Sequence, residues 1–144
     1  MASRAWNLIS ADFRTVLTAL SLTVPPKAVE TEEDGRATFG ADAWIRMGRA
    51  IDAEPHGAGF EYIRREMTIR RGIDINASMN SDEAYDAFVL AQDEIISAML
   101  DEDNQPSEVQ DIRLESAGDP IMQEPTFWIM EVLFTVVYAV DVCA

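Results

Sequence analysis

Hydrophobic residues recur at three- and four-residue steps near the start of the chain. Between Ser3 and Leu22 they are Trp6, Ile9, Phe13, Val16, Leu17 and Leu20. This spacing aligns apolar side chains along one stripe of a helix. The pair Pro25–Pro26 follows, and proline lacks the N–H that a helical hydrogen bond needs. The pattern therefore predicts an amphipathic helix that ends before the prolines.

Two later segments alternate apolar and polar residues, which is typical of half-buried strands. The first covers residues 43–53 and the second residues 62–75, with a turn containing Gly and Pro at 54–59. The apolar face of the second segment carries Ile63, Met67, Ile69, Ile73 and Ile75. Together the segments predict a long β-hairpin. Arg65 and Arg71 fall on that apolar face, so we expect part of it to lie near a sheet edge or an interface. The acidic segment 27–40 before the hairpin predicts a solvated loop with one short strand at 28–31.

A second helix has clear boundary signals. Asn80 is a suitable N-cap, with Glu83 three residues later and further acids in the first turn. The expected buried stripe consists of Tyr85, Phe88, Val89, Ile95, Ile96 and Met99. Residues 101–106 end the helix, and because acids oppose the dipole of a last turn, we expect that end to fray.

The remaining chain predicts two strands, at residues 109–115 and 127–142, separated by a turn at 118–120. The last strand is rich in β-branched and aromatic residues, which favours a strand covered on both faces. We therefore expect one α+β domain over residues 1–144, in the order α-β-β-α-β-β. Its sheet, mixed or antiparallel, packs with the two helices.

Charge is the most unusual feature of the composition. The 144 residues carry a net charge of −15, which excludes a protein that binds DNA phosphates. Residues 44–75 hold six arginines and five acids, whereas residues 82–131 hold fourteen acids and one base. Such asymmetry suits a subunit that presents opposite potentials to its neighbours, and equally an unevenly charged soluble surface. We predict no secretory leader and no membrane span.

Candidate catalytic and metal-binding groups lack partners in the sequence. His56 is the only histidine and lies in the predicted turn, and Cys143 is the only cysteine. Asp101 and Asp103 have the spacing that opens a calcium loop, but Pro106 and Ile112 occupy the positions of the required glycine and carboxylate. We therefore expect no enzyme activity, no cofactor and no metal.

Arginine on the predicted hairpin suggests a contact surface, because its planar fork pairs with carboxylates at interfaces. The candidate interface residues are Arg46, Arg49, Arg64, Arg65, Arg70 and Arg71. The acidic helix of one subunit could meet this hairpin on the next. Intrachain pairing with Glu61 and Glu66 explains the arginines equally well.

The order of elements resembles that of tail terminator (tail-completion) proteins of long-tailed bacteriophages. The resemblance is one of pattern over most of the chain, carried by the helix 5–20, the hairpin end 67–75, the helix 81–100 and the close 127–138. In that family an aromatic residue often opens the last strand, as Trp128 does here, and another lies near its end, as Tyr138 does. The loop at 27–40 has no counterpart in this pattern.

The resemblance implies a virion protein without catalysis. Members of the family form hexameric rings on the tail tube, where they end tube polymerisation and form the joint to the head. The implied partners are further copies of the chain, the tail tube protein and a head-completion or connector protein, with DNA only as passing cargo. An acidic lumen would repel that DNA. The candidate lumen-facing acids are Asp101, Glu102, Asp103 and Glu108.

Two other functions stay open. A different neck subunit, such as a head-completion or connector protein, could share this composition and element order. An acidic DNA mimic that blocks a DNA-binding enzyme ranks behind both, because a mimic needs regularly spaced surface acids and those of this chain are irregularly spaced.

Overall fold

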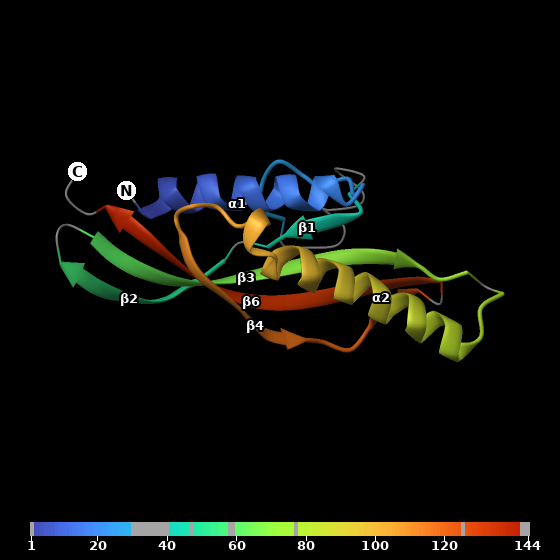
Figure 1. The fold of residues 1–144 in the computed structure, drawn as a ribbon. Coiled ribbons are helices and arrows are strands. Elements are labelled where there is room, and N and C mark those ends of the chain that lie inside the picture. Colours follow the sequence, from blue (N-terminus) through green and yellow to red (C-terminus); the bar gives the residue numbers. More distant parts are fainter. Residues whose placement is uncertain are drawn as a thin grey trace.

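The fold places two helices against one antiparallel sheet (Figure 1). The computed structural model describes residues 2–29, 41–46, 48–57, 60–76, 78–124 and 126–141. In chain order the elements are α1 (Ala2–Ala19), β1 (Ala43–Ile45), β2 (Ala50–Gly57), β3 (Phe60–Asp74), α2 (Ser81–Leu100), the 3-10 helix η2 (Glu102–Asn104), β4 (Val109–Ala117), β5 (Ile121–Glu124) and β6 (Phe127–Asp141). The predicted α+β class is confirmed.

Two long strands form the centre of the sheet. β3 and β6 are 15 residues each and pair along their whole length, from Phe60 opposite Asp141 to Asp74 opposite Phe127. β1 and β2 both pair with the outer side of β3, and β4 and β5 both pair with the outer side of β6. The predicted order α-β-β-α-β-β is therefore wrong, because three strands stand where two were expected on each side of α2.

The first extra strand arises where the predicted hairpin arm breaks in two. β1 ends at Ile45 and β2 begins at Ala50. Between them the backbone runs so close to β3 that a Cβ on Gly48 would overlap the carbonyl oxygen of Glu66. The arm's ladder continues only on either side of this approach. β2 then extends to Gly57, so most of the predicted turn is strand.

The second extra strand follows the predicted turn at 118–120. β4 runs on to Ala117, and after the turn β5 pairs with β6, Ile121 standing opposite Ile129. β5 has four residues, which is too short for a period-two pattern to stand out in the sequence. The predicted strand at 28–31 is not found at Ala28 and Val29, and its other two residues lie outside the described part of the chain.

Both helices pack on the same face of the sheet (Figure 1). The core combines Ile9, Phe13 and Leu17 of α1, Phe88, Ile95 and Met99 of α2, and alternate residues of β3 and β6 such as Met67, Ile69, Val132, Phe134 and Val136. A smaller cluster of Val29, Ala41 and Trp44 is buried separately from this core. Neither described helix is long and apolar enough to span a membrane.

The start of α2 confirms the sequence prediction, and its buried stripe partly corrects it. The Asn80 side chain accepts a hydrogen bond of 2.9 Å from the backbone N–H of Glu83, as expected of an N-cap. However, Tyr85 and Val89 are about half exposed, and Ala84 and Gln92 are buried with Phe88 instead. Tyr85 nevertheless contacts the sheet through its ring, which lies 5.4 Å from that of Trp128 in β6.

The end of α2 has side-chain hydrogen-bond donors that the sequence pattern did not predict. The side-chain amides of Asn104 and Gln105 donate to the carbonyl oxygens of Ala98 and Met99, at 3.0 and 3.3 Å. These donors satisfy carbonyl groups that a helix end leaves without partners. α2 has no basic residue in its last turn. The two amides therefore provide hydrogen bonds to the last carbonyl groups that a lysine or arginine side chain often provides.

Candidate interaction surface

The face of the sheet opposite the helices carries a mixture of charged and apolar side chains, and we call it the open face. It is formed by Arg64, Glu66, Thr68 and Arg70 of β3 opposite Val137, Thr135, Leu133 and Glu131 of β6. Leu133 and Val137 are only half-buried here. The expectation that β6 is covered on both faces is therefore wrong at Leu133 and Val137, although Thr135 between them and Phe127 and Ile129 at the start of β6 are buried.

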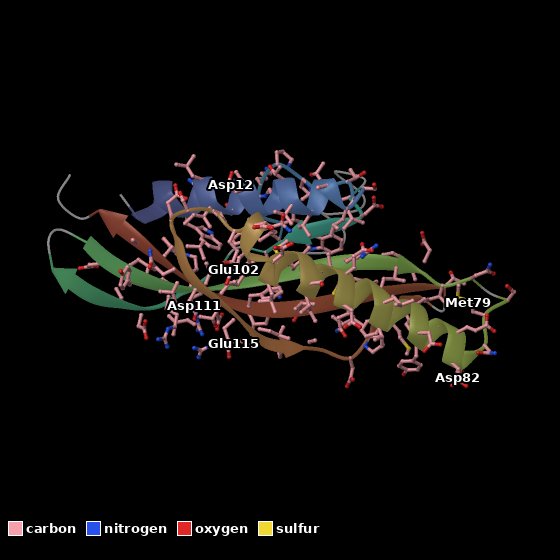
Figure 2. The ribbon with its side chains drawn as sticks, in the orientation of Figure 1. Asp12, Met79, Asp82, Glu102, Asp111 and Glu115 are labelled. Atoms are coloured by element: carbon pink, nitrogen blue, oxygen red, sulfur yellow. The ribbon has the colours of Figure 1, made fainter. Side chains whose placement is uncertain are left out.

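A shallow hollow of about 280 Å³ lies on the open face. Its floor is Leu133, Thr135 and Val137, and charged residues of β3 and β4 surround the floor, with Ile51 of β2 at one side. Figure 2 shows Asp111 and Glu115 of β4 on the side of the sheet away from α1 and its Asp12. An apolar floor with a polar rim is the usual anatomy of a protein–protein contact.

Ion pairs within the chain balance the charges on and beside this face. Their partners and N–O distances are Arg64–Asp52 3.8 Å, Arg49–Glu66 3.4 Å, Arg113–Asp111 3.7 Å, Arg46–Glu131 3.7 Å and Arg70–Glu131 2.6 Å. The exposed pairs contribute about 0–1 kcal/mol each. The half-buried, short Arg70–Glu131 pair is the strongest of them by geometry. The result is a surface with many charges and little net charge.

Two of the six candidate interface arginines lie under the helices. Arg65 donates to the hydroxyl of Tyr138 at 3.0 Å and to the carbonyl oxygen of Gly48 at 2.7 Å. Its guanidinium also lies 5.4 Å from the centre of the Trp6 ring. Arg71 donates to Glu94 of α2 at 2.9 Å. Arg65 and Arg71 were expected near a sheet edge or an interface. Since β3 has neighbours on both sides, the edge is ruled out, and the interface stays a prediction.

The other four candidate arginines, Arg46, Arg49, Arg64 and Arg70, pair with acids of the same chain. Intrachain pairing was one of the two explanations predicted for these arginines. Glu66 is a partner, as predicted, whereas Glu61 takes part in none of the ion pairs found among the described residues. The arginines therefore provide no surplus of positive charge on the hairpin. A role in contacts between subunits stays a prediction.

The segment formed by α2 and the residues up to 108 has the opposite character, and we call residues 81–108 the acidic layer. Residues 81–108 contain nine acids and no lysine or arginine. All nine are exposed, and in the described part of the chain only Glu94 forms an ion pair. The four candidate lumen-facing acids follow α2 in the chain: Asp101 caps η2 by accepting from the N–H of Asp103, Glu102 lies in η2, and Glu108 precedes β4. Figure 2 shows Asp82 and Glu102 well separated along α2.

The predicted lack of a catalytic or metal site stays a prediction. The backbone of His56 lies in β2, and its side chain and Cys143 are outside what the structure describes. Among the described residues no three His, Cys, Asp or Glu side chains are grouped so that they could hold a metal ion.

One further hollow was not suggested by the sequence. It lies beside α1, is lined by Arg14 and has a volume of about 350 Å³. Arg14 sits on the flank of the apolar stripe of α1, where arginine is normally solvated, so periodicity gave no reason to single it out.

Comparison with known proteins does not place the chain in a family. No protein-family model matches it, and no curated protein sequence matches it.

Proposed function

We propose that this chain is a structural virion protein that caps the tail tube of a long-tailed bacteriophage as a ring. In this role it ends tube polymerisation and forms the joint to the head, and it acts through assembly without a catalytic step. The observation that carries the proposal is the separation of charge between the two layers. The acidic layer, residues 81–108, holds nine acids and no base, whereas the open face is balanced by its own ion pairs.

Net charge limits how copies of this chain can meet. Each copy carries −15, so acidic surfaces brought together repel one another. A surface whose arginines and carboxylates already pair can be covered by another protein at a lower electrostatic cost. The open face has this property, and its floor of Leu133 and Val137 gives an apolar centre. We assign it to the contact with the tail tube.

The acidic layer suits the surface of a DNA channel. Asp101, Glu102, Asp103 and Glu108 are exposed and form no ion pairs among the described residues. Carboxylates facing the lumen repel phosphate groups, so DNA passes without binding. The proposed partners are accordingly further copies of the chain, the tail tube protein and a head-completion or connector protein.

The first test is the mass of the purified protein in solution. A hexamer of 16.0 kDa chains has a mass of about 96 kDa, and negative-stain images should show closed rings of that size. Light scattering after size-exclusion chromatography measures the mass directly. A species that stays monomeric at high concentration, both alone and with tubes, contradicts the proposal.

The second test measures tube capping. The tail tube protein from the same virion is polymerised with and without this chain, and tube lengths are measured by electron microscopy. The chain should decorate one end of each tube and stop its growth. Tubes that grow unchanged, while the chain binds only the connector, would instead favour a different neck subunit.

A further inference from the structure

The hollow beside α1 is lined by cations in an otherwise acidic molecule. Its wall comes from Trp6, Asn7, Ser10, Ala11 and Arg14 of α1, from Pro26, Lys27 and Ala28, and from Ile45 and Arg46. Three of these residues are basic, and no acid is among the described residues that line it. With 11 bases against 26 acids in the whole chain, such a cluster runs against the overall composition.

Arg14 is a basic residue of the hollow whose hydrogen bonding is incomplete. It is half-buried, and its Nη1 donates to the hydroxyl of Ser10 at 3.2 Å. Its Nε is buried without a hydrogen-bond partner, and none of the described carboxylates forms an ion pair with it. Burial lowers the pKa of Arg14 through desolvation, and none of the described acids pairs with it to offset this effect. A guanidinium in this setting gains most from an anion that completes its hydrogen bonds.

A pair of carboxylates that could bind such a guanidinium lies elsewhere on the chain. Asp82 and Asp86 lie one helical turn apart on α2, and both are exposed. Like charges at this spacing repel, so a cation from outside stabilises both. Tyr85 lies between them in sequence and exposes 47% of its surface, which adds an aromatic group of the kind that anchors interfaces.

These two surfaces cannot meet within one chain. No residue of α2 lines the hollow, and Figure 2 shows Asp82 at the start of α2, well away from Asp12 in the middle of α1. A contact between different places on two identical chains is head-to-tail, and such contacts close into rings when the rotation allows it.

We propose that the hollow at Arg14 is a carboxylate-binding site that receives the first turns of α2, with Asp82 and Asp86, from a second copy of this chain. The second copy as the occupant rests on the proposed ring. Double-stranded DNA is not the ligand, because its dense phosphates are repelled by the acids elsewhere on the surface.

The first experiment tests the site without requiring assembly. Glutarate, a dicarboxylate, is titrated into the isotopically labelled protein at low salt, and amide shifts of Trp6 to Arg14 are followed by NMR. Millimolar binding is expected, weakened about tenfold in Arg14→Met and retained in part in Arg14→Lys. Arg49→Met is the matched loss of one charge, since Arg49 lines neither hollow and its side chain is 77% exposed. Equal binding to Arg14→Met, or tighter binding of inorganic phosphate or duplex DNA, overturns the carboxylate site.

The second experiment tests the occupant by measuring association with sedimentation velocity. Asp82→Asn combined with Asp86→Asn should weaken association about tenfold, as Arg14→Met does. Glu102→Gln combined with Asp103→Asn removes the same charge elsewhere on the acidic layer and should not weaken it. An equimolar mixture of the Arg14 variant and the Asp82/Asp86 variant should stop at dimers, because one intact contact remains per pair.

The two experiments separate this inference from the proposed function. Rings that form equally well in every variant overturn the inference and leave the ring proposal standing. A wild-type chain that never associates, alone or on tubes, removes the ring and the second-copy occupant together. The glutarate titration still decides whether the site binds carboxylates.

Discussion

At the scale of single residues, the clearest consequence concerns the stability cost of Arg14. Its guanidinium is partly desolvated with no described carboxylate beside it. Arg14→Met keeps the aliphatic stem and removes the charge, so we expect the melting temperature of the isolated chain to rise by roughly 1–3 °C. Thermal unfolding followed by circular dichroism measures this shift.

The control separates desolvation from the general loss of a positive charge. Arg49→Met also adds one unit to the net negative charge, but at a solvent-exposed position paired with Glu66. We expect its melting temperature to stay level or fall slightly. A melting temperature that falls in Arg14→Met by more than in Arg49→Met would mean that Arg14 is a structural residue, held for stability.

Gly48 gives a second prediction at this scale. A Cβ at this position would overlap the carbonyl oxygen of Glu66 in β3, so the backbone must move in Gly48→Ala. We expect a loss of at least about 2 kcal/mol of unfolding free energy, measured by urea denaturation. Gly118→Ala is the matched control, because a Cβ there meets its nearest neighbour, the Glu131 carbonyl oxygen, at 3.9 Å. Equal urea midpoints for the two variants would contradict the close approach.

At the scale of elements, the N-cap of α2 can be tested directly. The Asn80 side chain accepts from the Glu83 N–H, so Asn80→Ala leaves that donor without its partner. We expect a loss of about 1 kcal/mol, visible as a lower urea midpoint with an unchanged slope. Asn80→Ser keeps an oxygen acceptor and should stay close to the wild type. If alanine and serine behave alike, the cap does not stabilise α2.

The elements that the sequence predicts correctly are those whose signal is local. The stripe of α1, the cap of α2 and the long strands β3 and β6 depend on spacing within one segment. The break at Gly48 and the short strand β5 depend on how near another strand lies, which no local pattern records. The pattern likewise predicts Tyr85 and Val89 in the core, but both are about half exposed, because the side of α2 that is buried depends on how the helix docks on the sheet.

For the candidate surface, too, the sequence shows which residues are present but not which of them meet. Arginine on the hairpin was visible in the sequence, but its partners were not, because Arg70 lies 61 residues from Glu131 and Arg71 lies 23 from Glu94. Pairing over such separations is set by strand register and helix docking. Arg14 was missed because its unusual environment is created by residues 26–28 and 45–46, which the fold brings beside α1.

At the scale of the whole molecule, the two layers have separate roles in the proposed ring. The acidic layer carries, through Asp82 and Asp86, one half of the proposed contact between copies, and the hollow beside α1 carries the other half. The open face remains available for a different partner, because its hollow shares no residue with the Arg14 hollow. The one link between the two surfaces is the ion pair of Arg46 with Glu131. Ring closure and tube capping should therefore be separable by mutation.

Ile51 provides that separation. It is 44% exposed at the side of the hollow on the open face, so Ile51→Glu adds an acid to the proposed tube contact with little effect on the core. We expect tube capping to weaken about tenfold or more, because a charge placed in an apolar contact must be desolvated. Ring mass should be unchanged.

Leu8→Glu is the control, because it makes a similar change on α1. Leu8 is 59% exposed and lines neither hollow, so this variant should leave capping intact. Tube-length distributions from electron microscopy measure the difference. Capping that survives Ile51→Glu would place the tube contact on another surface, and the balanced charges of the open face would then need a different explanation.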